Sequence, residues 1–274
     1  MKQLSLKYLL PAFVVVFSFA CTKRDGITNQ PYDAYGVSAS TGQLKINLAF
    51  AYAIDYNTLL IKINDKVVSN ALQSRTPFPG GGYNTRGSNF ALYLSVPQGA
   101  NKVSVIIPKV RTGEDSIVLF SNTITIPDNA PYTLHIADTL TPSVNNTKSL
   151  LVKNEIAKVD TGYCRFRFVN MIPNVSAVDV YLNGFLIRRN VAFMTATDTF
   201  SLRTGVFAPG FISGTTPTWA VRAAGAAPTS TAIASYASAN GLQSERVLTL
   251  FSMGYASTTG TRAPFIALTL DKNQ

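Results

Sequence analysis

The sequence predicts an all-β protein made of two tandem sandwich domains, and three observations carry this prediction. From Gln43 onward, apolar and polar residues alternate in short runs, which is the pattern of strands with one buried face. Turn-forming residues, such as Asn64-Asp65 and Asn183-Gly184, separate these runs. No stretch of a dozen residues has the apolar spacing of a helix, and the alanine-rich residues 220–239 include the helix breakers Gly225 and Pro228.

The alternating runs are rich in Val, Ile, Thr, Tyr and Phe, which fit a pleated surface. The clearest runs lie at residues 44–50, 59–63, 103–107, 134–136, 166–168 and 178–182. Asn183-Gly184 is the strongest turn signal, because a tight two-residue hairpin needs positive φ at both of its central positions. We therefore expect short strands with one solvated face in both halves of the chain.

The two halves of the chain share one layout. When the sequence is aligned with itself at an offset of about 119 positions, Leu44–Val68 aligns with Tyr163–Ile187. Both stretches have the pattern of a strand, a link and a second strand that ends in a turn. Each unit has about 110 residues and roughly seven short strands, the size and spacing of an immunoglobulin-like sandwich. We predict a first domain at 43–156, a linker at 157–161 and a second domain at 162–274.

The first twenty residues have the pattern of a secretory signal. Lys2 and Lys7 form a positively charged start, and residues 8–20 form an apolar run. This run is shorter than the roughly 20 apolar residues that a bilayer-spanning helix needs. We therefore expect residues 1–20 to be removed as a signal peptide.

The residues at the expected cleavage point, Ser18-Phe19-Ala20-Cys21, resemble the lipobox of bacterial lipoproteins. Ser18 stands where most lipoboxes carry Leu, as in the looser motifs of Bacteroidetes-type bacteria. The resemblance implies a lipid on Cys21 that anchors the protein to the outer membrane of the cell envelope, on either face. The polar residues 21–42 then form a flexible tether. The alternatives are an ordinary signal peptide before a chance cysteine, or an anchor that is never cut.

Composition narrows the classes of partner and cofactor. The net charge is +10, and it falls to +8 when Lys2 and Lys7 leave with the signal peptide. The basic residues are scattered, so we expect no nucleic-acid partner. Once Cys21 carries lipid, Cys164 is the only remaining cysteine, which excludes an intrachain disulfide and a cysteine-based zinc site. We expect no metal and no cofactor, and a buried Cys164.

Catalytic motifs are missing from the sequence. His135 is the single histidine, and it lies within a strand on the face opposite Leu134 and Ile136, where we expect solvent or a strand edge. The chain has no Gly-x-Ser-x-Gly elbow, and the glycines at 80–82 lack the Gly-Lys-Ser/Thr of a phosphate-binding loop. We therefore expect no catalytic residue and no enzymatic activity.

Two long loops are the candidate binding elements, because loops carry recognition more often than strands do. Pro77–Asn89 contains Phe78, Tyr83 and Arg86, and Thr204–Thr218 contains Phe207 and Phe211. The competing interpretation is that these aromatic residues pack beneath their own loops. We expect a non-catalytic binding module for a glycan or an envelope protein. The alternatives are a fimbrial or adhesin-type subunit that assembles through strand edges and, with less support, a divergent hydrolase.

The stretch Arg167–Gly184 resembles the opening of the bacterial domain-of-unknown-function 4397 family. That family begins with an Arg-x-x-His/Asn strand, a Pro-containing link and a Val-Asp-Val-Tyr-x-Asp/Asn-Gly hairpin. The matching residues are Arg167, Asn170, Pro173, Val178, Asp179, Val180, Tyr181, Asn183 and Gly184. Asn174 departs from the pattern, because the family has an acidic residue there. The resemblance covers the second half of the chain and implies a β-sandwich of a secreted or anchored protein, without an established activity.

Overall fold

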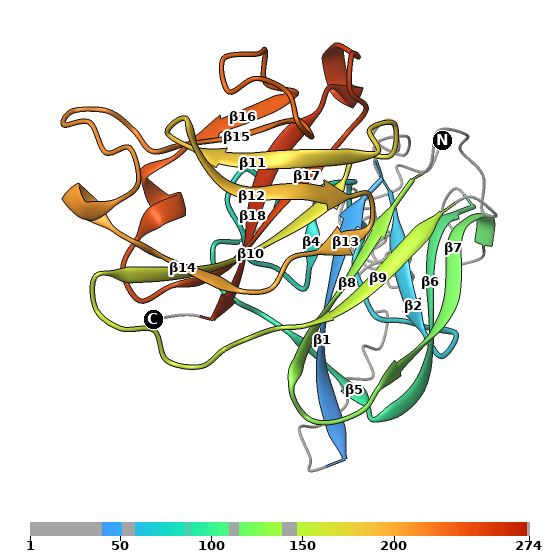
Figure 1. Ribbon diagram of the computed structural model, residues 1–274. Helices are drawn as coiled ribbons and strands as arrows, with labels where there is room; N and C mark the ends of the chain where they lie inside the picture. Colours follow the sequence, from blue (N-terminus) through green and yellow to red (C-terminus); the bar gives the residue numbers. More distant parts are fainter. Residues whose placement is uncertain (1–39, 51–57, 87, 110–114, 139–146, 273–274) are drawn as a thin grey trace, which may run out of the picture.

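The computed structural model describes residues 40–50, 58–86, 88–109, 115–138 and 147–272 (Figure 1). Helical structure among these residues is limited to short 3-10 turns at Gly205–Phe207, Ala239–Leu242 and Gly260–Arg262. All remaining regular structure is β-strand, so the prediction of an all-β protein built from sandwiches is confirmed.

The first sandwich consists of two sheets. One sheet has the order β4/β5, β1, β8, β9, where β4 and β5 pair with different parts of β1, and the other has the order β3, β2, β6, β7. Their bounds are β1 Thr41–Ala49, β2 Leu60–Ile63, β3 Lys66–Val67, β4 Pro77–Phe78, β5 Leu94–Pro97, β6 Gly99–Pro108, β7 Asp115–Ile126, β8 Pro131–Ala137 and β9 Lys148–Lys153.

The second sandwich repeats this order strand for strand. One sheet has the order β13/β14, β10, β17, β18, and the other has the order β12, β11, β15, β16. Their bounds are β10 Tyr163–Met171, β11 Ala177–Leu182, β12 Phe185–Ala192, β13 Thr195–Ala196, β14 Phe200–Arg203, β15 Thr218–Ala223, β16 Ala234–Ala237, β17 Val247–Met253 and β18 Phe265–Lys272.

Equivalent residues of the two units are not separated by a constant distance along the chain. Leu44 pairs with Leu94 in the same way that Phe166 pairs with Phe200, which places β1 and β10 122 residues apart. The hairpin turns at Asn64 and Asn183 are 119 residues apart, and both asparagines have positive φ as the turn type requires. The shared layout therefore holds, but the alignment by 119 positions is wrong by three residues at the first strand.

A parallel strand pair lies at the centre of each unit. β1 runs parallel to β8, and β10 runs parallel to β17, whereas the other pairs are antiparallel. Parallel neighbours need a long crossover between them. The connection here is the whole second sheet of each sandwich, which lies between the paired strands in the sequence.

Each sandwich has its own apolar core between its two sheets. In the first, Leu44, Ile46 and Leu48 of β1 pack with Ile61 and Val105 of the opposite sheet. In the second, Phe166 stacks on Phe200 and meets Trp219 edge-on, with ring centroids 5.9 and 5.0 Å apart. Cys164 is fully buried in this core, as predicted for a small apolar residue.

The two sandwiches pack sheet against sheet through the faces that do not line their cores. In Figure 1, β1, β8 and β9 lie beside the β10, β17 and β18 sheet. A shared apolar cluster joins them, composed of Ala49, Ala137, Val169, Met171, Phe251, Met253 and Ala267. The predicted solvated face of β1 and β8 is therefore covered, and Lys45, Asn47 and His135 are fully buried. The prediction that His135 meets solvent or an edge is wrong because the second sandwich covers it.

Candidate functional site

Cys21, the predicted lipidation site, lies outside the described residues. No helix within the described ranges is long and apolar enough to cross a bilayer. The same part of the chain holds no group of three or more His, Cys, Asp or Glu side chains that could bind a metal ion.

The loop after β4 crosses from the first sandwich to the second, and we call its described residues, 79–86 and 88–93, the strap. Tyr83 on the strap pairs with Leu268 of β18 through two backbone hydrogen bonds of 2.8 and 3.0 Å. Its side chain is only 9% exposed and belongs to the core of the second sandwich. Arg246 donates a hydrogen bond to the Tyr83 hydroxyl. The prediction that Tyr83 contacts a ligand is therefore corrected, because the side chain packs between the units.

The glycines of the strap permit this close approach. A Cβ atom at Gly82 would lie 2.4 Å from the Leu268 carbonyl oxygen, and one at Gly81 would lie 2.2 Å from the Phe90 carbonyl oxygen. Real Cβ atoms do not reach such distances, so only glycine fits. The other two predicted loop residues differ: Phe78 is half-buried against the first core, while Arg86 is exposed and donates to Gln73.

The second predicted loop lies on the surface at one end of the second sandwich. Phe207 and Phe211 are 66% and 40% exposed, so neither packs beneath its loop. Ala208 between them is buried in the core and holds the loop in place. The structure thus leaves both phenylalanines available to a partner.

The β11–β12 hairpin adds a third aromatic residue to this surface. Asn183 at the hairpin turn donates a 2.8 Å hydrogen bond to the Pro209 carbonyl, and Phe185 lies directly against Gly210. Phe185 is 58% exposed, and Val206 and Ile212 are each 65% exposed. We define the distal apolar patch as Phe185, Val206, Phe207, Phe211 and Ile212.

Sequence reasoning missed three members of the distal apolar patch. Phe185 follows the Asn183-Gly184 turn directly, which was a usable signal for an apolar residue at a hairpin tip. Val206 and Ile212 lie in the predicted loop, but they are not aromatic, and the prediction rested on aromatic residues. Hydrogen bonds of Asn183 and the contact of Phe185 with Gly210 bring the hairpin and the loop together.

A cation flanks the distal apolar patch. The Arg203 guanidinium lies 5.0 Å from the Phe207 ring centroid, and its Nε donates a 3.2 Å hydrogen bond to the Tyr163 hydroxyl. Among the described residues, no carboxylate pairs with Arg203. An exposed arginine over an aromatic ring favours an acidic group on whatever binds there.

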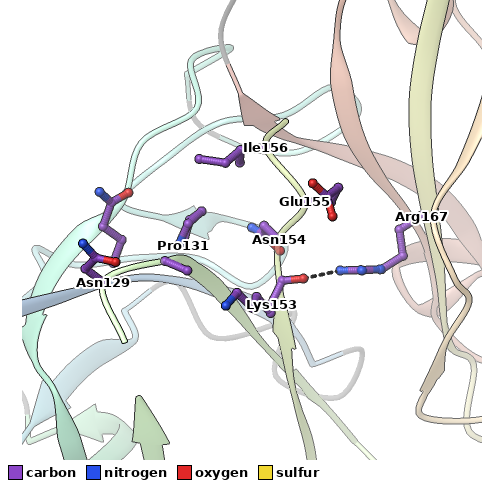
Figure 2. A pocket seen from close by; sticks show the side chains of 9 residues that line it. Asn129, Pro131, Lys153, Asn154, Glu155, Ile156 and Arg167 are labelled. Carbon is purple, nitrogen blue, oxygen red and sulfur yellow. Dashed lines mark hydrogen bonds between the residues drawn. The ribbon is translucent and has the colours of Figure 1, made fainter. Parts of the chain in front are cut away.

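A cleft of about 470 Å³ opens where the linker joins the two sandwiches, and we call it the interdomain cleft (Figure 2). Figure 2 shows Asn129 and Pro131 on one side and Arg167 of β10 on the other, with Lys153 between them. Arg167 reaches across the boundary and donates to the Lys153 carbonyl oxygen.

A buried polar network lies behind this cleft. Asn154 donates 2.8 Å hydrogen bonds to the Thr133 and Tyr93 hydroxyls and a 3.3 Å hydrogen bond to Asp271. Burial lowers the pKa of Lys45 to about 8, although the Asp271 carboxylate favours its charged form. Burial likewise raises the pKa of Asp271. The network therefore consists of polar groups that depend on one another for hydrogen bonds.

His135 lies in the same interface and has the environment of a packing residue. Its Nδ1 lies 3.1 Å from the amide nitrogen of Asn47, and its ring meets Phe251 edge-on. Full burial, together with the charges of Arg167 and Lys45, lowers its pKa to about 3. Among the described residues, no carboxylate hydrogen-bonds this imidazole as the aspartate of a catalytic triad would.

Comparison with known protein families finds a match to part of the chain. The model of a domain of unknown function (DUF4397) matches residues 61–181. The match runs from β2 to β11 and includes Arg167–Tyr181, most of the stretch that suggested the family. It extends over the first sandwich instead of the remainder of the second, where the resemblance had placed it. No curated protein matches the chain.

Proposed function

We propose that the chain, whose residues 61–181 match the DUF4397 family of domains of unknown function, is a lipid-anchored envelope protein that binds a protein partner without catalysis. The distal apolar patch carries this proposal. Its five large apolar side chains are each at least 40% exposed and gather on one loop and one hairpin tip. Apolar side chains that cluster on a surface mark interaction sites, whereas scattered ones do not.

The chemistry of the patch favours a protein over a glycan. None of the five side chains can donate or accept a hydrogen bond, and sugars need such pairing for their hydroxyl groups. A protein surface can supply apolar side chains for the patch and an acidic residue for Arg203. The net charge of +8 that remains after Lys2 and Lys7 leave adds a general attraction toward acidic partners.

Crosslinking from within the patch tests this proposal. A photoreactive phenylalanine analogue at position 207 should crosslink one envelope protein in cells, whereas the same analogue at position 90 should not. Phe90 is a matched control because it is also exposed, at 65%, but lies on the strap. The partner, once purified, should bind the Phe185→Ser/Phe207→Ser/Phe211→Ser variant more weakly by about 2 kcal/mol or more.

Three results would argue against this assignment. Equal crosslinking from positions 90 and 207 would show that the patch is not specific. If the wild-type protein bound a glycan array and the triple variant did not, the partner of the patch would be a sugar and not a protein. If the purified wild-type protein formed polymers and the triple variant did not, the partner would be a second copy of the chain, as expected for a fimbrial subunit.

Cys21 carries the anchoring part of the proposal. A thiol after a signal-like segment receives lipid in lipoproteins, and more than one acyl chain is needed for firm anchoring. Cys21→Ser should therefore move the protein from the membrane fraction to the soluble fraction and abolish palmitate labelling. An unlabelled wild-type protein that partitions like the variant would contradict the lipid anchor.

A further inference from the structure

The cations around the interdomain cleft differ in whether they form an ion pair. Lys153 lies 2.7 Å from Asp128, and Arg165 lies 3.9 Å from Glu155. Arg167 has no carboxylate within ion-pair distance among the described residues. One of its terminal nitrogens donates to the Lys153 carbonyl, and its other donors have no acceptor in the described protein. Since a guanidinium offers five donors in a plane, Arg167 presents an unfilled edge to the cleft.

The other walls of the cleft combine amide and apolar groups. The side chains of Gln43 and Asn129 line it and make no hydrogen bond to the described residues, so both amides are available to a ligand. Pro131 and Ile156, the latter 40% exposed, provide apolar surface beside them. A volume of about 470 Å³ lies within the range of small-molecule sites and can hold one or two sugar units.

From this arrangement we propose that the interdomain cleft binds a sugar that carries a carboxylate, such as a uronate unit. A planar carboxylate matches the fork of Arg167, which has no carboxylate within ion-pair distance among the described residues. The amides of Gln43 and Asn129 then pair with hydroxyl groups, and the apolar C–H face of the ring packs on Pro131 and Ile156. A multiply charged phosphate fits less well, because the Glu155 carboxylate also lines the cleft.

This site is separate from the distal apolar patch, so it stands or falls independently of the proposed protein partner. The cleft is built from β1, β8, β9 and β10, whereas the patch is built from the β11–β12 hairpin and the loop after β14. Changes in one should leave binding at the other unaltered.

Calorimetry and saturation-transfer NMR on the mature chain test the cleft with sodium glucuronate, glucose and acetate as probes. Glucuronate should bind, while glucose lacks the carboxylate and acetate lacks the hydroxyls, so both should bind at least about tenfold more weakly. Arg167→Gln should weaken glucuronate binding by about tenfold or more, and Arg167→Lys should recover only part of it. Arg189→Gln is the matched control, because Arg189 is an exposed arginine of β12 that does not line the cleft, and this variant should bind as the wild type does.

Arg167 also ties the two sandwiches together, so a second variant separates binding from folding. Asn129→Ala removes a side chain that makes no internal hydrogen bond, and it should weaken glucuronate binding without changing the melting temperature. Equal binding of glucuronate and glucose would overturn the proposal. So would wild-type affinity in both Arg167→Gln and Asn129→Ala, or acetate binding as strong as that of glucuronate.

Discussion

Lys45 and Asp271 lie inside the interface between the two sandwiches, where neither reaches solvent. Lys45 donates to the Leu270 carbonyl and lies 4.6 Å from the centroid of the Tyr93 ring. Asp271 accepts a 2.6 Å hydrogen bond from Thr249. Charges that are taken out of water are tolerated only when opposite charges and hydrogen bonds compensate them, so each of these residues depends on the other.

A double-mutant cycle measures this dependence. Asp271→Leu leaves the buried ammonium of Lys45 uncompensated and should lower the free energy of unfolding by roughly 3–5 kcal/mol. Combining it with Lys45→Met should recover most of that loss, because no buried charge remains. Chemical denaturation of the four proteins gives the coupling energy, and strictly additive effects would show that the two residues do not interact.

The single histidine makes the interface sensitive to acid. The pKa of His135 is lowered to about 3 by burial and by Arg167 and Lys45, so the unfolded chain binds a proton that the folded chain does not. The contribution of neutral His135 to the free energy of unfolding is fully present above pH 6.5, and it is lost as the pH falls toward 3. Between pH 7 and pH 4, the free energy of unfolding of His135→Gln should therefore fall by roughly 3 kcal/mol less than that of the wild type.

Denaturation curves at several pH values, compared between wild type and His135→Gln, isolate this effect. The raised pKa of Asp271 gives a pH dependence of the opposite sign, but Asp271 is present in both proteins and its effect cancels in the difference. An NMR titration of the histidine ring follows the same group directly. A ring that titrates near pH 6.5 in the folded protein would contradict its burial.

Among the structural elements, the strap joins the two sandwiches most directly. It adds Tyr83 to the edge of β18 by backbone pairing, and its side chain completes the second core. Asn84 and Tyr93 extend the contact through hydrogen bonds of 2.6 and 2.9 Å to the carbonyls of Ile266 and Asp271. The strap therefore also covers part of the edge of β18, which would otherwise be open to other strands.

Replacing Tyr83 tests the structural role of the strap. Tyr83→Ala should lower the free energy of unfolding by about 3 kcal/mol, because a large aromatic side chain leaves the core. Tyr83→Phe keeps the ring and should cost only about 1 kcal/mol, the value of the hydrogen bond from Arg246. The exposed Arg86→Ala is the control. If Tyr83→Ala melted like the wild type, the strap would not hold the second core together.

At the scale of the whole molecule, the two units use equivalent sheets to pack against each other. Lys45 of β1 and Arg167 of β10 occupy equivalent positions, and each donates to a backbone carbonyl of the opposite unit. Thr133 and Thr249 are also equivalent, and they hydrogen-bond Asn154 and Asp271 at the same boundary. The repeated unit thus forms an interface in which the two halves make similar contacts.

Cleavage of the linker tests how strongly the halves associate. The residues at 157–161 are exposed except for Val159, so a protease should cut there first. The two fragments should nevertheless elute together on gel filtration, because the shared apolar cluster and the strap hold them. Fragments that separate in native buffer would show that the sandwiches are independent domains.

Local patterns were sufficient to predict the fold class, the tight turns and six of the strands, which are β1, β2, β6, β8, β10 and β11. Period-two alternation indicates a strand with one buried face, and Asn183-Gly184 indicates a turn with positive φ. Each of these patterns is contained within a few consecutive residues. The same reasoning placed Phe207 and Phe211 on a loop, and the structure leaves them exposed there.

What covers the other face of a strand is decided only by the tertiary structure. Lys45 and His135 have the pattern of solvated residues, yet the second sandwich buries them. Tyr83 has the pattern of a loop residue, yet it completes a core whose other members lie 80 or more residues away along the chain. The physical reason is that burial depends on contacts between distant parts of the chain, which no local pattern records. The distal apolar patch and the interdomain cleft arise from the same kind of contact.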